Sequence, residues 1–210
     1  VYDKEVAETW EVGFKSRFWD GRVNFNAAAF LTDTKNAQLL EFFPQGGLQA
    51  ISSADKVKMK GAEFDLSVAA TEWLGLFAGL GLLDTNVKEF TGNPAAVGNK
   101  RPSTSPMTIN AGFTVDKPID DTYTFIARAD YRYQGKTYWD WVATEGAERS
   151  GYSLVNASAG VQTEAWKIVL WAKNLLDKKY NAEHIVLLPG IGALWRAPER
   201  TWGVEFDYRF

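Results

Sequence analysis

In the stretch of residues 200–210, the side chains from Thr201 onward place apolar residues at every second position. Successive side chains of a β-strand point to opposite faces of a sheet, so this stretch predicts a strand with one aromatic and one charged face. A helix is excluded, because about 3.6 residues per turn would spread both sets around its circumference. The aromatic face carries Trp202, Val204, Phe206, Tyr208 and Phe210, and the opposite face carries Thr201, Gly203, Glu205, Asp207 and Arg209.

Two environments fit this alternation. In a soluble sheet the aromatic face packs in a core and the charged face meets water. In an outer-membrane barrel the aromatic face meets lipid and the charged face lines a polar lumen. The rest of the chain has to decide between them.

Composition narrows the class of protein. The 210 residues have a net charge of -3 and no massed basic segment, so a nucleic-acid partner is not expected. Nine tryptophans and 14% aromatic residues are typical of rings placed at a membrane interface. The chain has no cysteine and no apolar run near the ~18–20 residues of a membrane-spanning helix. Any crossing of a membrane must therefore use β-strands.

The period-two pattern recurs along the whole chain and predicts an all-β, antiparallel meander of about nine long strands. Their lengths match the ~9–11 tilted residues that a membrane strand needs, whereas sandwich strands are shorter. The connections are alternately short and long, with long loops predicted over about residues 33–55, 87–105, 135–151 and 175–199. The predicted strands are 9–18, 23–32, 56–68, 74–84, 108–115, 123–133, 152–162, 166–174 and 200–210.

Aromatic residues sit beside every short turn. Because the short turns lie at one end of the sheet, these rings form a belt at one membrane interface. The belt residues are Phe18, Trp19, Trp73, Tyr123, Trp166, Tyr208 and Phe210. Together with the strand lengths, the belt favours a transmembrane barrel in the bacterial outer membrane, with lipid as its partner.

The odd strand count predicts an incomplete barrel. The first and last strands run in the same direction, so they cannot pair antiparallel and close the sheet. Unpaired edge groups in lipid are very costly. We therefore expect residues 1–210 to be the C-terminal part of a larger barrel.

Four short motifs carry a family resemblance. They are Glu-Val-Gly-Phe-Lys at 11–15, Lys-Gly-Ala-Glu at 60–63, Asn-Leu-Leu-Asp-Lys-Lys-Tyr at 174–180, and the ending that starts Pro-Glu-Arg-Thr-Trp-Gly at 198–203. With these motifs in this order, the chain resembles the C-terminal β-barrel region of a TonB-dependent outer-membrane receptor, closest to the siderophore receptors.

The resemblance implies a 22-stranded barrel with a plugged lumen, of which this chain would supply roughly the last nine strands. It implies a receptor and not an enzyme, which takes up a scarce nutrient by coupling to the TonB complex. An iron–siderophore complex is the commonest ligand, while cobalamin, haem and oligosaccharides remain open. The family's plug domain, N-terminal strands and TonB-contacting box have no counterpart in these residues. The terminal aromatics Trp202, Phe206, Tyr208 and Phe210 would be the signal for the barrel-assembly machinery.

A ladder of charged residues is predicted on the lumen side. As a set, these residues are candidates for hydrogen bonds and ion pairs to the plug. For any single residue a solvated wall is the favoured interpretation, with cross-strand pairs that contribute only ~0.2–1 kcal/mol each. The ladder comprises Glu11, Lys15, Arg17, Glu63, Asp65, Arg128, Asp130, Arg132, Glu205, Asp207 and Arg209.

Two long loops hold the candidates for ligand contact. Aromatic residues of the 135–151 loop would stack on a ligand, or would form the upper interfacial belt. His184 lies in the last loop and would contact a metal complex, or would be an ordinary loop residue. No second histidine or cysteine stands beside it, so no resident metal site or cofactor is predicted. The candidates are Tyr138, Trp139, Trp141, His184, Trp195 and Arg196.

Two other classes of function stay open at this point. A small outer-membrane barrel enzyme would need His184 to act on Ser150 or Ser153, which belong to or border a different loop. A soluble β-sandwich binding module would bury Trp202, Phe206 and Tyr208 in its own core.

Overall fold

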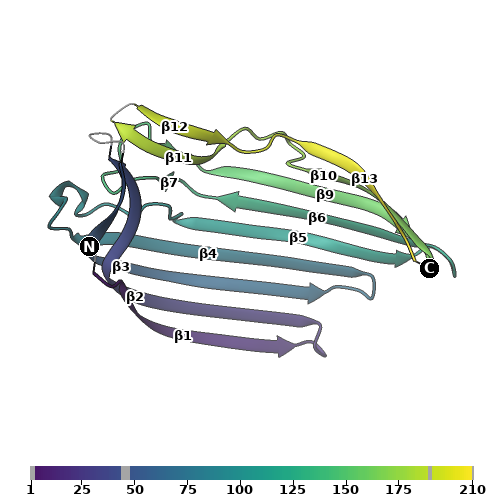
Figure 1. The fold of residues 1–210 in the computed structure, drawn as a ribbon. Coiled ribbons are helices and arrows are strands. Elements are labelled where there is room, and N and C mark those ends of the chain that lie inside the picture. Colours follow the sequence, from purple (N-terminus) through teal and green to yellow (C-terminus); the bar gives the residue numbers. More distant parts are fainter. Residues whose placement is uncertain (1–2, 44–47, 189–190, 210) are drawn as a thin grey trace.

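The computed structural model describes residues 3–43, 48–188 and 191–209. Nine strands form one antiparallel sheet in which every strand pairs with the next one along the chain, apart from two inserted hairpins (Figure 1). The strands are β1 (Val6–Phe18), β2 (Val23–Phe43), β3 (Leu48–Ala69), β4 (Leu74–Glu89), β5 (Met107–Pro118), β6 (Thr124–Gln134), β9 (Tyr152–Gln162), β10 (Trp166–Lys173) and β13 (Thr201–Tyr208).

The inserted hairpins lie in the long connections. Strands β7 (Thr137–Tyr138) and β8 (Glu148–Arg149) pair with each other, as do β11 (Asn181–Leu188) and β12 (Ile191–Arg196). The loop after β4 contains a short 3-10 helix, η2 (Pro94–Ala96). No helix among the described residues is long and apolar enough to cross a membrane.

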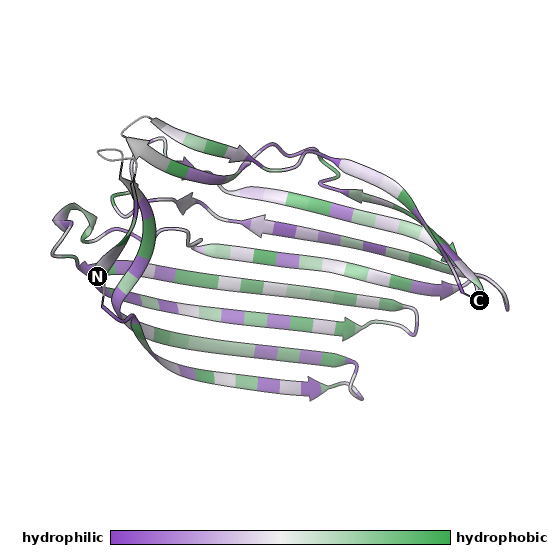
Figure 2. Cartoon of the chain, in the orientation of Figure 1, coloured by the Kyte–Doolittle hydropathy of each residue, from purple (hydrophilic) through white to green (hydrophobic). Residues whose placement is uncertain are grey.

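The pairing register joins apolar side chains into a continuous face across all nine strands. Residues that stand directly opposite each other in neighbouring strands lie on the same face of the sheet. Figure 2 shows the alternation of hydropathy along the strands. One apolar row that crosses six neighbouring strands consists of Phe14, Ala27, Phe64, Leu80, Ile109 and Tyr133.

This apolar face is exposed. Trp10 at one edge of the sheet is 73% exposed and Trp202 at the other edge is 71% exposed. Phe206 and Tyr208, which a soluble sandwich would bury, are also exposed. The alternative of a soluble sandwich is therefore excluded for the described residues, which form the predicted single curved sheet with no protein covering its aromatic surface (Figure 1).

The opposite face is polar, as the alternation predicts. A representative row runs Lys15, Asn26, Asp65, Gly79, Asn110, Arg132. Some aliphatic residues, such as Ile126 and Val169, also lie on this face, and two further exceptions are aromatic rings that cover glycines. Phe30 lies over Gly61 and Phe77 over Gly112, where an added Cβ atom would collide with the ring. These glycines let large rings lie flat on an otherwise polar face.

The apolar face forms a band of limited height. On β2 the outward residues run from Val23 to Leu31, and the next outward residue is Asp33. On β4 the change to polar residues comes between Leu82 and Asp84. The length of the band agrees with the ~9–11 residues of a tilted membrane strand. The strands of the β1–β4 part of the sheet continue beyond it with charged outer faces.

The aromatic belt lies where it was predicted. Phe18, Trp19 and Tyr123 are exposed at the end of the sheet that carries the short turns. Tyr123 packs edge-on against Trp166 with ring centroids 6.2 Å apart, and Trp166 is the cross-strand partner of Tyr208. Phe210, the last predicted member, lies outside the described residues.

The long connection predicted over residues 33–55 is wrong. Strands β2 and β3 continue pairing to Phe43 and Leu48, so this segment is a hairpin. Its outer part bends away from the sheet and approaches β11 (Figure 1). Asn36 stands at the bend with φ of 53°, a left-handed conformation that asparagine tolerates. The polar residues around it belong to a strand in water, where lipid does not impose an apolar face.

The two faces can be tested on neighbouring residues of one strand. Ala27 lies in the middle of the apolar band, and Asn26 lies on the polar face between Lys15 and Asp65. We predict that Ala27→Arg lowers the unfolding free energy in lipid vesicles by about 2–4 kcal/mol, the cost of a cation near the bilayer midplane. The matched Asn26→Arg change should cost less than about 1 kcal/mol. Urea titration in vesicles measures both, and equal losses would contradict the assignment of the faces.

Candidate ligand-facing surface

The polar face carries the predicted charged ladder, but only part of it is internally paired. Lys167 on β10 lies 2.9 Å from Glu205 and 2.8 Å from Asp207 on β13. Asp130 accepts a hydrogen bond from Asn156 at 2.7 Å and lies 3.8 Å from Arg128. The Lys167 pairs and the Asn156–Asp130 hydrogen bond connect neighbouring strands, whereas Arg128 and Asp130 pair within β6.

Other members of the ladder have no ion pair within the described part of the chain. Arg17 donates only to the backbone oxygen of Gly21, at 3.3 Å. The polar groups of such residues face the concave space of the sheet and are available to water or to another polypeptide. The remaining members without an ion pair are Glu11, Lys15, Glu63, Asp65, Arg132 and Arg209.

Above the apolar band, the loops pack into a small hydrophobic cluster on the inner side of β2–β4. Trp141 from the β7–β8 connection inserts into it and is 1% exposed. Its ring meets Phe90 edge-on at a centroid distance of 5.6 Å, and its indole N–H donates to Ser52 Oγ at 2.9 Å. The cluster comprises Ala37, Ala54, Val57, Val87, Phe90, Ala96 and Trp141. It fixes two long loops to the β2–β3 hairpin.

A second cluster forms around the Arg149 guanidinium. The cation lies over the rings of Trp139 and Tyr152, at 5.4 and 4.8 Å from the centroids, and Nη2 donates to Thr137 Oγ1 at 3.1 Å. Its Nε atom is buried without a hydrogen-bond partner. In the described parts of the chain no carboxylate lies within ion-pair distance of Arg149. Two aromatic faces and one hydroxyl thus hold a buried cation that has no carboxylate partner in the described residues.

Tyr180 connects this cluster to the last loop. Its ring stacks on Tyr152 with centroids 4.1 Å apart, and burial raises the pKa of Tyr180, with a further contribution from Tyr152. On its other side Tyr180 lines a cavity of about 310 Å³ together with Arg196 and Glu199. Contacts therefore run from Trp139 through Arg149, Tyr152 and Tyr180 to the β11–β12 hairpin.

The motif at residues 174–180 has a structural role at the base of that hairpin. Asn174 is left-handed, with φ of 50°, and is buried. Its side chain donates to the carbonyl oxygens of Lys178 and Pro198 at 3.0 and 3.3 Å, and accepts from the Lys178 N–H at 2.8 Å. One side chain thus holds both ends of the last long connection together.

The predicted ligand-contact residues fall into three environments. Trp141 is buried in the hydrophobic cluster, so its ring has no surface for a ligand. Tyr138 and Trp139 are half-buried in the β7–β8 hairpin, where Lys136 lies over the Tyr138 ring. A second set lies on β11–β12, where the His184 ring rests against Gly192 and Trp195 is 49% exposed. That set is His184, Trp195 and Arg196.

Three residues of this surface escaped the sequence analysis. Arg149 ends β8 and Tyr152 begins β9, so the two residues lie close in sequence, but no motif in this segment indicated a cation–π contact. Tyr180 belongs to a noted motif, but its stacking partner is distant in sequence. Within the described ranges no three His, Cys, Asp or Glu residues are grouped as metal ligands. Ser153, a candidate nucleophile of the enzyme alternative, shares a hydrogen bond with the Tyr131 hydroxyl at 2.8 Å.

Comparison with known proteins establishes the family. A family model described as TonB dependent receptor-like, beta-barrel matches residues 2–175. This chain belongs to the TonB-dependent receptor β-barrel family. Members of the family are receptors of the bacterial outer membrane and not enzymes, so the apolar band of this receptor barrel faces lipid.

Individual relatives are distant and much longer. The ferric-pyoverdine M114 receptor PbuA from Pseudomonas sp. (strain M114) is 24% identical over 178 residues, which cover 83% of this chain and 21% of PbuA. The ferric yersiniabactin uptake receptor FyuA from Yersinia pestis superimposes with a TM-score of 0.82 at 20% identity, over 98% of this chain and 30% of FyuA. The siderophore receptor PiuA from Acinetobacter baumannii gives 0.75 at 22% identity, over 95% and 28%. The chain thus spans less than a third of each relative.

The Trp141 contact should control the order of the loops in this receptor barrel. Trp141→Ala removes a fully buried ring, and such changes cost about 3–5 kcal/mol. Because the cluster lies outside the membrane band, we expect the loss to appear as local opening. Hydrogen exchange at the amides of Val87 and Ala96 should accelerate strongly. The matched change Val142→Ala, at a neighbouring residue that is 40% exposed, should leave exchange within about 0.5 kcal/mol of wild type.

Glu41 gives the same loops a pH dependence. Burial raises the pKa of Glu41 above its ordinary value of 4.5, and Asp140 adds to the shift. The carboxyl therefore favours the folded hairpin when it is neutral, and this contribution is lost as the pH rises through the raised pKa.

We expect Glu41→Gln to increase protection of the β2–β3 hairpin at neutral pH and to reduce its difference between acidic and neutral pH. Hydrogen exchange corrected for the intrinsic pH effect measures this. Glu145→Gln, at an exposed position of the β7–β8 connection, should leave the difference unchanged. An unaltered profile in Glu41→Gln would contradict the role of its burial.

Proposed function

We propose that this chain forms the C-terminal part of the barrel of an outer-membrane receptor that takes up an iron–siderophore complex. The observation that carries the proposal is the sorting of the sheet into an apolar face for lipid and a polar face for an enclosed lumen, with structured loops at one end only. The named relatives support the ligand class, since PbuA is a ferric-pyoverdine receptor and FyuA a ferric yersiniabactin uptake receptor.

Closure of the barrel requires further strands. Strands β1 and β13 are the two edges of a nine-stranded antiparallel meander, so they run in the same direction. An odd number of additional strands would let the edges close antiparallel, in agreement with the even totals of bacterial barrels. In the proposal these strands belong to the same receptor, together with a plug domain that fills the lumen.

The ladder residues without internal ion pairs are the proposed contacts with that plug. Lys15, Asp65 and Arg132 share one cross-strand row and present both signs of charge to the lumen. Mixed charges of this kind bind a polar plug surface through many weak contacts, so the plug is not fixed in one position. Pulling on the plug through the TonB complex would then exchange these contacts for water at small net cost.

The proposed ligand surface combines two loops. Trp139 and Tyr138 come from the β7–β8 hairpin, and His184, Trp195 and Arg196 from β11–β12. The contacts through Arg149 and Tyr180 hold the two hairpins in one arrangement, which reduces the ordering cost of binding. Aromatic faces and a cationic guanidinium suit a ligand with flat rings and anionic groups.

The terminal strand provides the proposed assembly signal. Trp202, Phe206 and Tyr208 are exposed in one row on β13, which is an edge strand of the sheet. An edge strand with an aromatic face is suited to recognition by the barrel-assembly machinery. Phe210 belongs to the proposed signal, and it lies outside the described residues.

Uptake assays test the transport proposal. A strain that lacks the gene should lose growth on one or more ferric siderophores as sole iron source, and the wild-type gene should restore it. An uncoupler of the inner-membrane proton gradient should abolish uptake of radiolabelled iron. Unchanged growth on every siderophore offered, with loss of copper or cobalamin uptake instead, would contradict the ligand class and leave the receptor class intact.

Two neighbouring residues on β12 test the ligand surface. We expect Trp195→Ala to weaken binding of the transported ferric siderophore by roughly 2- to 10-fold, the value of one aromatic contact. Leu194, which is 55% exposed and adjacent on the same strand, provides the matched control Leu194→Ala. Fluorescence titration of the purified receptor measures the dissociation constant of each variant. Equal affinities of the two variants would show that Trp195 does not contact the ligand.

A further inference from the structure

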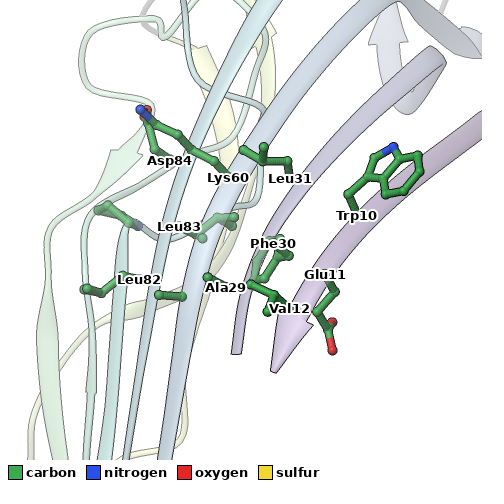
Figure 3. A pocket seen from close by; sticks show the side chains of 13 residues that line it. Trp10, Glu11, Val12, Ala29, Phe30, Leu31, Lys60, Leu82, Leu83 and Asp84 are labelled. Atoms are coloured by element: carbon green, nitrogen blue, oxygen red, sulfur yellow. The ribbon is translucent and has the colours of Figure 1, made fainter. Parts of the chain in front are cut away.

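The outer face of the sheet contains a groove at the upper margin of the apolar band. Its volume is about 780 Å³, and it crosses strands β1 to β4. The small residues Ala29 and Ala62 and the backbone of Gly61 form its floor. Trp10 and Leu82 stand at opposite sides, as Figure 3 shows. The groove arises because small side chains on the two inner strands lie between large ones on the outer strands.

A polar pocket continues this groove away from the band. It has a volume of about 420 Å³ and shares Trp10, Leu31, Lys60 and Asp84 with the groove. Charged side chains line it, among them Lys58 and Lys88. Apolar groove and polar pocket therefore form one continuous amphipathic depression.

The charges around the pocket leave a surplus of lysines. Asp33 lies 3.5 Å from Lys58, and Asp84 lies 3.5 Å from Lys60 and also pairs with Lys100. These pairs occupy both aspartates. Among the described residues, Lys88 in the pocket has no carboxylate within ion-pair distance. Further out, the cross-strand neighbours Lys35 and Lys56 have none either. Two carboxylates stand near these three cations, Glu8 in the pocket and Glu89 as the cross-strand partner of Lys56, so the lysines remain in excess.

We propose that this depression binds an anionic membrane lipid with a phosphorylated headgroup. An acyl chain lies in the groove against Ala29, Ala62 and Leu82, and the phosphate lies beside Lys88 and Lys56. An acyl chain that fills the groove gains van der Waals contacts with the apolar side chains that line it. Each lysine near the membrane surface attracts the anionic headgroup. The Trp10 indole stands at the junction, the depth at which such rings are stable in a bilayer. The inference rests on the membrane location alone and not on which ligand is transported.

The sheet contains an internal comparison for this site. A second apolar hollow of about 560 Å³ lies on the same outer face at the end with the short turns, lined by Tyr123, Ala159, Trp166 and Leu170 among others. No charged residue lines it. If an apolar hollow alone were enough to retain lipid, both hollows would bind lipid equally. If the lysines contribute, only the groove at β1–β4 distinguishes between lipid headgroups.

Lipid titration of the purified receptor tests the proposal. Native mass spectrometry in detergent would follow binding of phosphatidylglycerol and of phosphatidylcholine with the same acyl chains. We expect wild type to bind the anionic lipid more tightly, and Lys56→Gln and Lys88→Gln each to weaken it about fivefold. Ala62→Phe, which fills the groove, should lower retention of phosphatidylglycerol, whereas Ala159→Phe in the second hollow should not.

Two outcomes would overturn the proposal. One is equal affinity of wild type for the two headgroups. The other is loss of phosphatidylglycerol in Ala159→Phe as large as in Ala62→Phe, which would indicate unspecific adhesion to the apolar band. The lysine variants test the site even if the Phe variants fail to fold, because Lys88 is exposed and Lys56 is only partly buried, and both lie outside the band. An unchanged affinity in the double variant Lys56→Gln, Lys88→Gln also refutes the site.

Discussion

The structure depends on one constraint: backbone N–H and C=O groups inside a bilayer must find partners within the protein, because lipid offers none. The nine paired strands meet this constraint at every internal position of the sheet. In the described residues β1 and β13 are the edges of the sheet, and neither has a second neighbouring strand. The need to pair those edges in lipid, more than any side-chain contact, supports the proposal that the sheet is part of a larger barrel.

In a strand that crosses the membrane, alternate side chains face lipid on one side of the sheet and water on the other. Residues on one face of β2 from Val23 to Leu31 suit hydrocarbon, and Asp33 marks the point at which water returns. Beyond that level the same strands no longer need an apolar exterior. They bury Ala37, Ala54 and Val57 under loops instead, with Trp141 as the central ring. The molecule thus has a membrane part without a core and an outer part with a small conventional one.

The membrane part was predictable from sequence because lipid imposes a strict period on each strand. The stretch 123–133 was predicted as a strand and β6 occupies Thr124–Gln134, and the predicted 152–162 coincides with β9. Outside the bilayer that period disappears. Residues 33–43 therefore looked like a loop although they form strand, and Trp141 looked like a ligand contact although it is buried. The Arg149 cluster depends on the pairing of β7 with β8, which brings Thr137 and Trp139 to Arg149, and the sequence pattern did not predict that hairpin.

The central claim is that the two faces of each strand meet different solvents. Spin labels on single cysteines introduced along β6, in a chain without native cysteine, measure this directly in lipid vesicles. The account predicts that accessibility to oxygen peaks at Phe125, Ala127, Ala129, Tyr131 and Tyr133, and that accessibility to a water-soluble nickel complex peaks at the residues between them. Accessibility without a two-residue period, or with the two profiles exchanged, would contradict it.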